Sequence, residues 1–278
     1  MKIIKNIIAS LSRSYVFTVR SVAFLYQHKK LLLLPVFCYL SWIILYFILS
    51  VVVRHYANKV SIGAALAGGI LIGYFLLCFV FIFFNAVVIS CTLSQLQNKK
   101  TSITGGIVTA LKRLGKLLGW GLLNTTFGLI MYLLDFFDDT ISPKILDVPW
   151  SLYSNFAIPM IICENIGPID ALCHCRKLFG HKWHHVSSIN LIYIIIILAP
   201  LYFLVYMLNY NSTLSVILAN VALLLLLLFT LAIIVIYPTL LNIIRSALYL
   251  HLAKKETISN FDDALLNRAL IANDQDQH

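Results

Sequence analysis

The sequence predicts an all-α fold, a polytopic transmembrane helix bundle of about six spans, and three observations lead to this prediction. Only 12% of the 278 residues are charged and 60% are hydrophobic, whereas a soluble domain has roughly 25% charged residues and about half apolar ones. The apolar residues are gathered in long uncharged runs. The Lys and Arg residues lie between these runs. Lipid is the solvent that suits such a chain, and helices satisfy every backbone polar group within a spanning segment.

Six runs are predicted to cross the membrane, near residues 31–53, 62–93, 117–134, 148–163, 186–208 and 214–244. The first, second, fifth and sixth contain no Asp, Glu, Lys or Arg and exceed the roughly 20 residues that a spanning helix needs. The third has 18 residues, within the usual range. The fourth has 16 residues with Pro159 inside it, so it either spans the membrane or re-enters on the same side.

The distribution of Lys and Arg predicts the orientation of the spans. Of the 21 Lys and Arg residues, 18 lie in residues 1–30, 94–116, 164–185 and 245–278. Cytoplasmic loops are enriched in Lys and Arg, so we expect these segments and both termini in the cytoplasm. Residues 1–255 then form a single transmembrane domain, and residues 256–278 form a polar cytoplasmic tail.

The expected location is a cell membrane, a bacterial inner membrane in our interpretation, although an organelle membrane would give a similar sequence. The first apolar run is too long for the core of a cleavable signal peptide. None of the six cysteines lies in a predicted outside loop, so no disulfide framework is expected. We expect membrane lipids as partners, with protein partners or a homo-oligomer as further candidates. Nucleic acid is not expected, because no compact soluble domain carries the basic residues.

Each pair of spans is preceded by a basic stretch with apolar residues at helical spacing, which predicts three interfacial amphipathic helices. Their apolar residues are Ile3, Ile4, Ile7, Ile8 and Leu11 in the first, Ile103, Ile107, Leu111, Leu114 and Leu118 in the second, and Ile169, Leu172, Leu178 and Phe179 in the third, which starts at Pro168. Such helices lie among lipid headgroups with the basic side toward anionic lipid. They either connect and anchor the spans or bind headgroups, and the periodicity does not decide between these roles.

Short motifs follow one another in order from the second span to the fifth. Residues 83–86 read F-F-N-A, residues 150–152 read W-S-L, Pro159 follows, and residues 164–171 read E-N-I-G-P-I-D-A. The chain resembles a family of prokaryotic multi-pass integral membrane proteins known only as a domain of unknown function, whose members share these elements. The resemblance covers about two thirds of the chain and implies this topology, with no assigned activity, cofactor or reaction. The chain departs from the family after these elements, at Cys173–His174–Cys175.

Glu164 is the most informative charged residue, because it ends the fourth apolar run where the third amphipathic helix begins. An acid near membrane depth must face protein or water and find a partner, and Arg176, Lys182 and Arg245 are predicted on the same side. Its carboxylate also precedes the helix start at residues 167–168, where negative charge complements the helix dipole. We expect a structural cap or ion pair, and the alternative is a transport or proton-relay role.

Asparagines within the apolar spans are the second group of polar candidates. An amide inside a bundle usually hydrogen-bonds a neighbouring helix, and several amides together could instead line a substrate path. The structural or pathway candidates are thus Glu164, Asn85, Asn124, Pro159, Gly167, Pro168 and Trp150.

Cys173, Cys175 and His181 are the candidate metal ligands in a short cluster of Cys and His residues. Structural zinc sites usually pair ligands at short gaps on both arms, whereas Cys-x-Cys on a helix directs its thiols about 200° apart. We therefore expect no bound metal, and no other cofactor.

The sequence lacks the common enzymatic motifs, such as a phosphate-cradling Gly-rich loop or a Gly-x-Ser-x-Gly elbow. We therefore expect a non-enzymatic membrane component, either a lipid-contacting scaffold or a subunit of a complex. The alternative is a small transporter or channel with a polar path through the bundle.

Topology reporters test the six-span prediction. A reporter fused after Asp139 or at Asn211 should read as outside, and one fused after Lys100 or Lys182 as cytoplasmic. A cytoplasmic reading at Asp139 would contradict the six-span arrangement. An outside reading at Lys182 alone would show that residues 148–163 re-enter.

Overall fold

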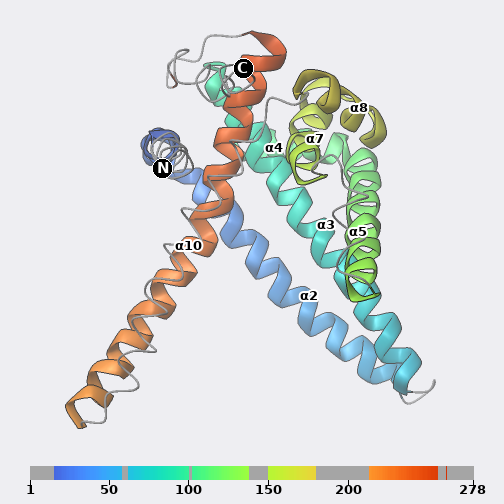
Figure 1. Cartoon of the computed structure of the whole chain (residues 1–278), viewed down its shortest axis with the longest axis vertical. Helices are drawn as coiled ribbons and strands as arrows, with labels where there is room; N and C mark the ends of the chain where they lie inside the picture. The colour runs from blue at the N-terminus through green and yellow to red at the C-terminus, as the bar shows by residue number, and fades with distance from the viewer. Residues whose placement is uncertain are drawn as a thin grey trace, which may run out of the picture.

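The computed structural model describes residues 16–57, 62–99, 102–137, 150–179, 213–255 and 261. These residues form helices with no β-strand among them, which confirms the predicted all-α class. Residues 16–27 are helical and lead into the 3₁₀ turn η1 (Lys29–Leu32). The helices that follow are α2 (Leu33–Ala57), α3 (Ile62–Leu96), α4 (Ile103–Lys112), α5 (Leu114–Phe137), α7 (Trp150–Glu164), α8 (Pro168–Phe179) and α10 (Thr213–Lys254) (Figure 1).

Three of the described segments are long and apolar enough to cross a membrane, namely Lys29–His55, Gly68–Leu96 and Leu224–Lys254. They correspond to the first, second and sixth predicted spans. Helix α5 contains the third predicted span and extends beyond it at both ends. The fifth predicted span, at residues 186–208, and the first predicted interfacial helix lie outside the described residues.

The fourth predicted span corresponds to α7, which has 15 residues and ends at Glu164. After three intervening residues α8 begins at Pro168, as predicted, and the chain turns by 111° between the two helices. Such a pair is either a broken span or a re-entrant segment, so both alternatives for residues 148–163 stay open.

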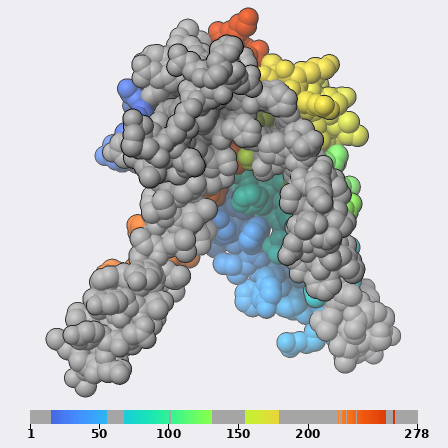
Figure 2. Space-filling model, viewed as in Figure 1, coloured from blue at the N-terminus to red at the C-terminus, as the bar shows by residue number. Residues whose placement is uncertain are grey.

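Helix α3 is the centre of the fold, because it contacts α2, α4, α5, α7 and α10. Helices α2 and α10 diverge, and we call α2 and the first half of α10 the two arms. Helices α4, α7 and α8 gather at one end of the molecule (Figure 1). One apolar core occupies this end and includes Phe24, Ile89, Ala110, Ala171 and Leu248. Figure 2 shows α2, in blue, running away from that end. We call it the packed end, and the described parts of all four Lys- and Arg-rich segments contribute to it.

Small residues set the closest approach between α3 and α4. A methyl group on Gly106 would overlap Cys91 Sγ and lie 3.3 Å from the Val87 carbonyl oxygen, so the two helix backbones approach closely there. Ser102 caps α4, because its hydroxyl accepts a hydrogen bond from the Gly105 backbone N–H at 3.1 Å. Small residues allow this contact where lipid supplies no hydrophobic drive for helix association.

The predicted apolar residues of the second and third amphipathic helices are not the side chains that pack deepest in the core. Leu111 is 50% exposed and Ile169 is 66% exposed, whereas Ala171 and Cys175 are fully buried. Helix α4 also ends at Lys112 instead of continuing through Leu118. Small side chains occupy the buried faces of α4 and α8 because they let the helices approach closely. Several large apolar side chains on these helices point outward.

Replacing Gly106 with Ala tests the contact between α3 and α4. We expect the variant to lose about 1–3 kcal/mol of unfolding free energy, the usual range for overpacking, measured by denaturation in detergent. Gly115→Ala is the matched control, because no atom beyond its chain neighbours and the backbone of its own helix turn lies within 4 Å of the added methyl group. The double change Gly106→Ala with Cys91→Ala should recover most of the loss. Equal stability of the Gly106 and Gly115 variants would refute the tight contact.

Candidate functional site

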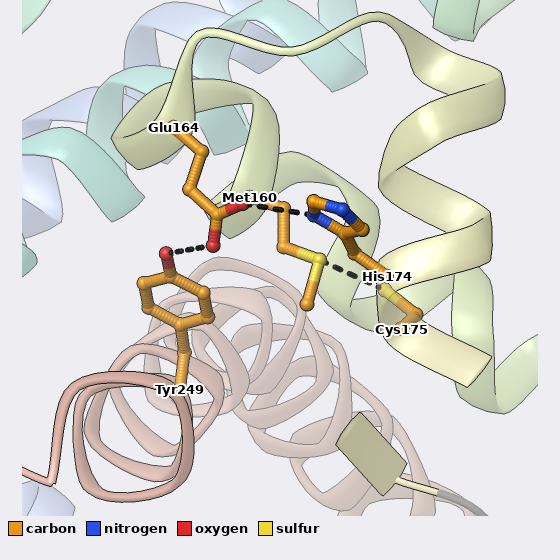
Figure 3. Close-up of polar contacts among 5 residues, drawn as sticks. All are labelled: Met160, Glu164, His174, Cys175 and Tyr249. Carbon is orange, nitrogen blue, oxygen red and sulfur yellow. Dashed lines mark hydrogen bonds and ion pairs between the residues drawn. The ribbon is translucent and has the colours of Figure 1, made fainter. Parts of the chain in front are cut away.

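A carboxylate joins three helices at the packed end, and Figure 3 shows its partners. Glu164 is the last residue of α7. Its Oε1 accepts a hydrogen bond from the Tyr249 hydroxyl of α10 at 2.8 Å, and its Oε2 lies 3.1 Å from His174 Nδ1 of α8. Tyr249 is fully buried, while the side chain of His174 is about half exposed. We call these three residues the Glu164 clamp.

The position of Glu164 explains why it needs donors. The carboxyl end of a helix carries partial negative charge, which repels a carboxylate. The Glu164 side chain is only 30% exposed, so water alone does not compensate. A hydroxyl proton from Tyr249 and an N–H proton from the His174 ring supply that compensation. Asp170, in the first turn of α8, is the acidic residue that complements the dipole of that helix.

Residues of α5 contact the turn between α7 and α8 and stabilise it. Lys116 Nζ donates a hydrogen bond to Asn165 Oδ1 at 2.8 Å and another to the Asn165 carbonyl oxygen. Asn165 has φ of 55°, a left-handed conformation that Asn tolerates better than most residues. A methyl group on Gly119 would lie 3.3 Å from Pro168 Cγ, so α5 packs directly against the start of α8. The Gly167 carbonyl accepts the first hydrogen bond of α8, from the Ala171 N–H at 2.9 Å.

Two asparagines tie α3 to α10. The side-chain amide of Asn242 donates to Asn85 Oδ1, and the amide of Asn85 donates to the Phe81 carbonyl at 2.8 Å. Arg245 Nη1 donates to Asn242 Oδ1 at 3.3 Å. Asn242 is 1% exposed and Asn85 is 9% exposed. Asn85 thus makes the bond to a neighbouring helix that a buried amide is expected to make, and we call Asn85 and Asn242 the amide pair.

A cavity of about 20 Å³ lies beside the amide pair. Pro35 and Tyr39 of α2 and Pro238 and Thr239 of α10 also line it. A polar cavity needs about 10–15 Å³ to hold one water molecule. The site therefore has room for about one water between three helices.

The structure places the other sequence candidates apart from these two groups. Asn124 is partly buried on α5, and Pro159 is buried within α7. Trp150 begins α7, but its side chain lies outside the described residues.

The two candidate metal ligands that the structure describes are not brought together. Cys173 is exposed, whereas Cys175 is fully buried with its Sγ 3.4 Å from Met160 Sδ (Figure 3). The two thiols therefore face different ways, as the Cys-x-Cys spacing predicts. His181 lies outside the described residues. Within the described part of the chain, no three His, Cys, Asp or Glu side chains are grouped as metal ligands would be.

Sequence reasoning missed Asn242 and Tyr249, which complete the two polar groups. They are seven residues apart, so they share one face of α10. Polar side chains at that spacing in an otherwise apolar helix are the signal that could have indicated them.

Glu164→Gln tests the clamp. We expect it to lower the unfolding free energy by about 1.5–3 kcal/mol, the range for hydrogen bonds to charged groups, measured by thermal unfolding in detergent. Tyr249→Phe removes one donor and should cost a comparable amount.

His174→Ala is the matched control, because its partly exposed pair with Glu164 should contribute only about 0–1 kcal/mol. Unchanged stability of Glu164→Gln would show that the carboxylate is simply solvated.

Comparisons with known proteins place the whole site within one family. No curated protein and no solved structure matches the chain. A family model described as "Family of unknown function (DUF6159)" matches residues 67–258, well over half of the chain. This range contains the Glu164 clamp and the amide pair, and the match agrees with the uncharacterised family that the sequence resembles. The chain therefore belongs to the family of unknown function DUF6159.

Proposed function

We propose that the chain is a non-enzymatic, multi-pass component of a bacterial inner membrane, with both termini in the cytoplasm. Its role is that of a lipid-contacting scaffold or of a subunit in a larger membrane complex. The polar groups of the packed end hold the helices together, and the apolar arms meet the lipid.

The observation that supports this proposal is the outer surface of the two arms. Large apolar side chains that are about half exposed or more follow one another along α2 and the first half of α10. They are Leu40, Ile43, Ile44, Phe47, Ile48 and Val51 on α2, and Leu224, Leu225, Leu228 and Leu231 on α10. Soluble monomers rarely expose apolar patches of this extent. Lipid chains are the environment in which such a surface is stable.

The arrangement of the polar side chains supports a structural role over a catalytic one. Both carboxylate oxygens of Glu164 bind groups on other helices. The carbonyl oxygens of Asn85 and Asn242 each accept a hydrogen bond within the bundle. These side chains therefore serve to join helices.

The packed end also supports the orientation. It gathers residues from the four segments that hold most of the Lys and Arg residues. The cytoplasmic side is where such residues concentrate.

A small transporter or channel is the second candidate, and the cavity beside the amide pair favours it. The cavity lies where α2, α3 and α10 meet and is lined by Pro35 and Pro238. Proline within a membrane helix permits bending when neighbouring groups satisfy the released carbonyl. Bending at these residues would widen the cavity beside the amide pair into a path.

Photocrosslinking in the native membrane tests lipid contact by the arms. A photoreactive amino acid at Ile44 or at Leu225 should form phospholipid adducts detectable by mass spectrometry. At Leu34, which is 1% exposed, the same group should crosslink within the chain. A single recurrent protein adduct at Ile44 would favour the subunit role. Absence of lipid adducts at both exposed positions would contradict the scaffold.

Reconstituted vesicles separate the scaffold from the transporter. We expect ion and solute fluxes no greater than those of empty vesicles. A flux that Asn242→Leu abolishes would establish a path through the amide pair instead.

A further inference from the structure

Arg245 is a charge in an unusual place. It follows the uncharged run of residues 214–244, whose length at 1.5 Å per residue is about 46 Å. The hydrocarbon core with both headgroup regions measures about 40–45 Å, so Arg245 lies at headgroup depth. Its guanidinium extends back toward Asn242, one turn deeper, in the direction in which helical side chains point. The cation is thus directed into the bundle.

The guanidinium lacks an anionic partner in the described part of the chain. Arg has five N–H donors, and among the described residues Arg245 uses one, to Asn242 Oδ1. No Asp or Glu oxygen lies within 4 Å of it there, and the carboxylate of Glu164 is occupied by Tyr249 and His174. A cation at this depth is expected to have a partner.

The amide pair holds this cation in position. A chain of hydrogen bonds runs from the Phe81 carbonyl through Asn85 and Asn242 to Arg245. Asn242 is almost fully buried and fixed by Asn85. Asn85 and Asn242 are therefore positioning residues, and Arg245 is the group whose donors remain for a ligand.

We propose that Arg245 binds the phosphate of an anionic phospholipid headgroup. The planar guanidinium pairs with two phosphate oxygens at once, a geometry that a Lys ammonium does not match. Basic pockets between membrane helices on the cytoplasmic side are typical sites for such headgroups. The inference rests on the proposed lipid contact and names the lipid class and the residue that selects it.

Thermal unfolding of the full chain in a mild neutral detergent tests the proposal. The added probes are phosphatidylglycerol, phosphatidylcholine and inorganic phosphate. Phosphatidylglycerol should raise the Tm of the natural sequence by roughly 5 °C more than phosphatidylcholine does. Arg245→Gln should abolish this difference. Lys254→Gln is the matched control, because it removes an exposed cation near the end of the same helix and should leave the difference intact.

If Arg245→Gln does not fold, Asn242→Asp tests whether phosphatidylglycerol binds at Arg245. The new carboxylate would lie within one hydrogen bond of the guanidinium and supply an internal anion. The response to phosphatidylglycerol should then disappear although the cation is still present. Arg245→Lys should keep only part of the response, because it keeps the charge without the planar fork.

Besides equal stabilisation by both lipids, three results would overturn the inference. They are an undiminished difference in Arg245→Gln, an undiminished difference in Asn242→Asp, and an equal rise in Tm with inorganic phosphate alone, which would exclude the lipid as the source. Failure of the scaffold itself is distinct, because neither lipid would then stabilise the natural sequence. Stabilisation by both lipids to the same extent contradicts only the role of Arg245.

Discussion

The packed end depends on a carboxylate that needs donors from other helices. Glu164 stands at the negative end of α7, where Tyr249 and His174 compensate its charge. Tyr249 is buried in the middle of the packed end and His174 lies on the helix that follows the turn. One anion thus sets the position of α8 relative to α7 and of both relative to α10.

The amide pair adds a second polar contact to α10, and the two contacts together specify the placement of this helix. Asn242 and Tyr249 lie on one face of α10, about 10 Å apart along its axis at 1.5 Å per residue. One binds α3 and the other binds α7. Two polar contacts at different positions along the axis of α10 fix its rotation about that axis and its translation along it. Apolar packing alone specifies this rotation and translation poorly when the solvent is also apolar.

The sequence predicts the helices better than their contacts. The uncharged runs indicate α2, α3 and α10 because the length of such a run is a local property, and Gly167–Pro168 marks the start of α8 for the same reason. The side chains of α4 and α8 that pack deepest in the core could not be predicted, since large apolar residues face lipid as readily as protein. The partners of Glu164 were expected among cations, yet a phenol and an imidazole bind it. Asn85 and Asn242 are 157 residues apart, and no local pattern shows that they meet.

Helix α10 is a continuous element of 42 residues, about 63 Å long at 1.5 Å per residue, or roughly twice the thickness of a hydrocarbon core. Six large side chains in its amino-terminal half are exposed, namely Val221, Leu224, Leu225, Leu228, Phe229 and Leu231, whereas residues 246–250 are buried. One continuous helix therefore has an exposed apolar surface in its amino-terminal half and lies within the core of the packed end near its carboxyl end. A tilt that a thinner or thicker bilayer imposes on the exposed half of α10 would therefore also reorient the helices of the packed end.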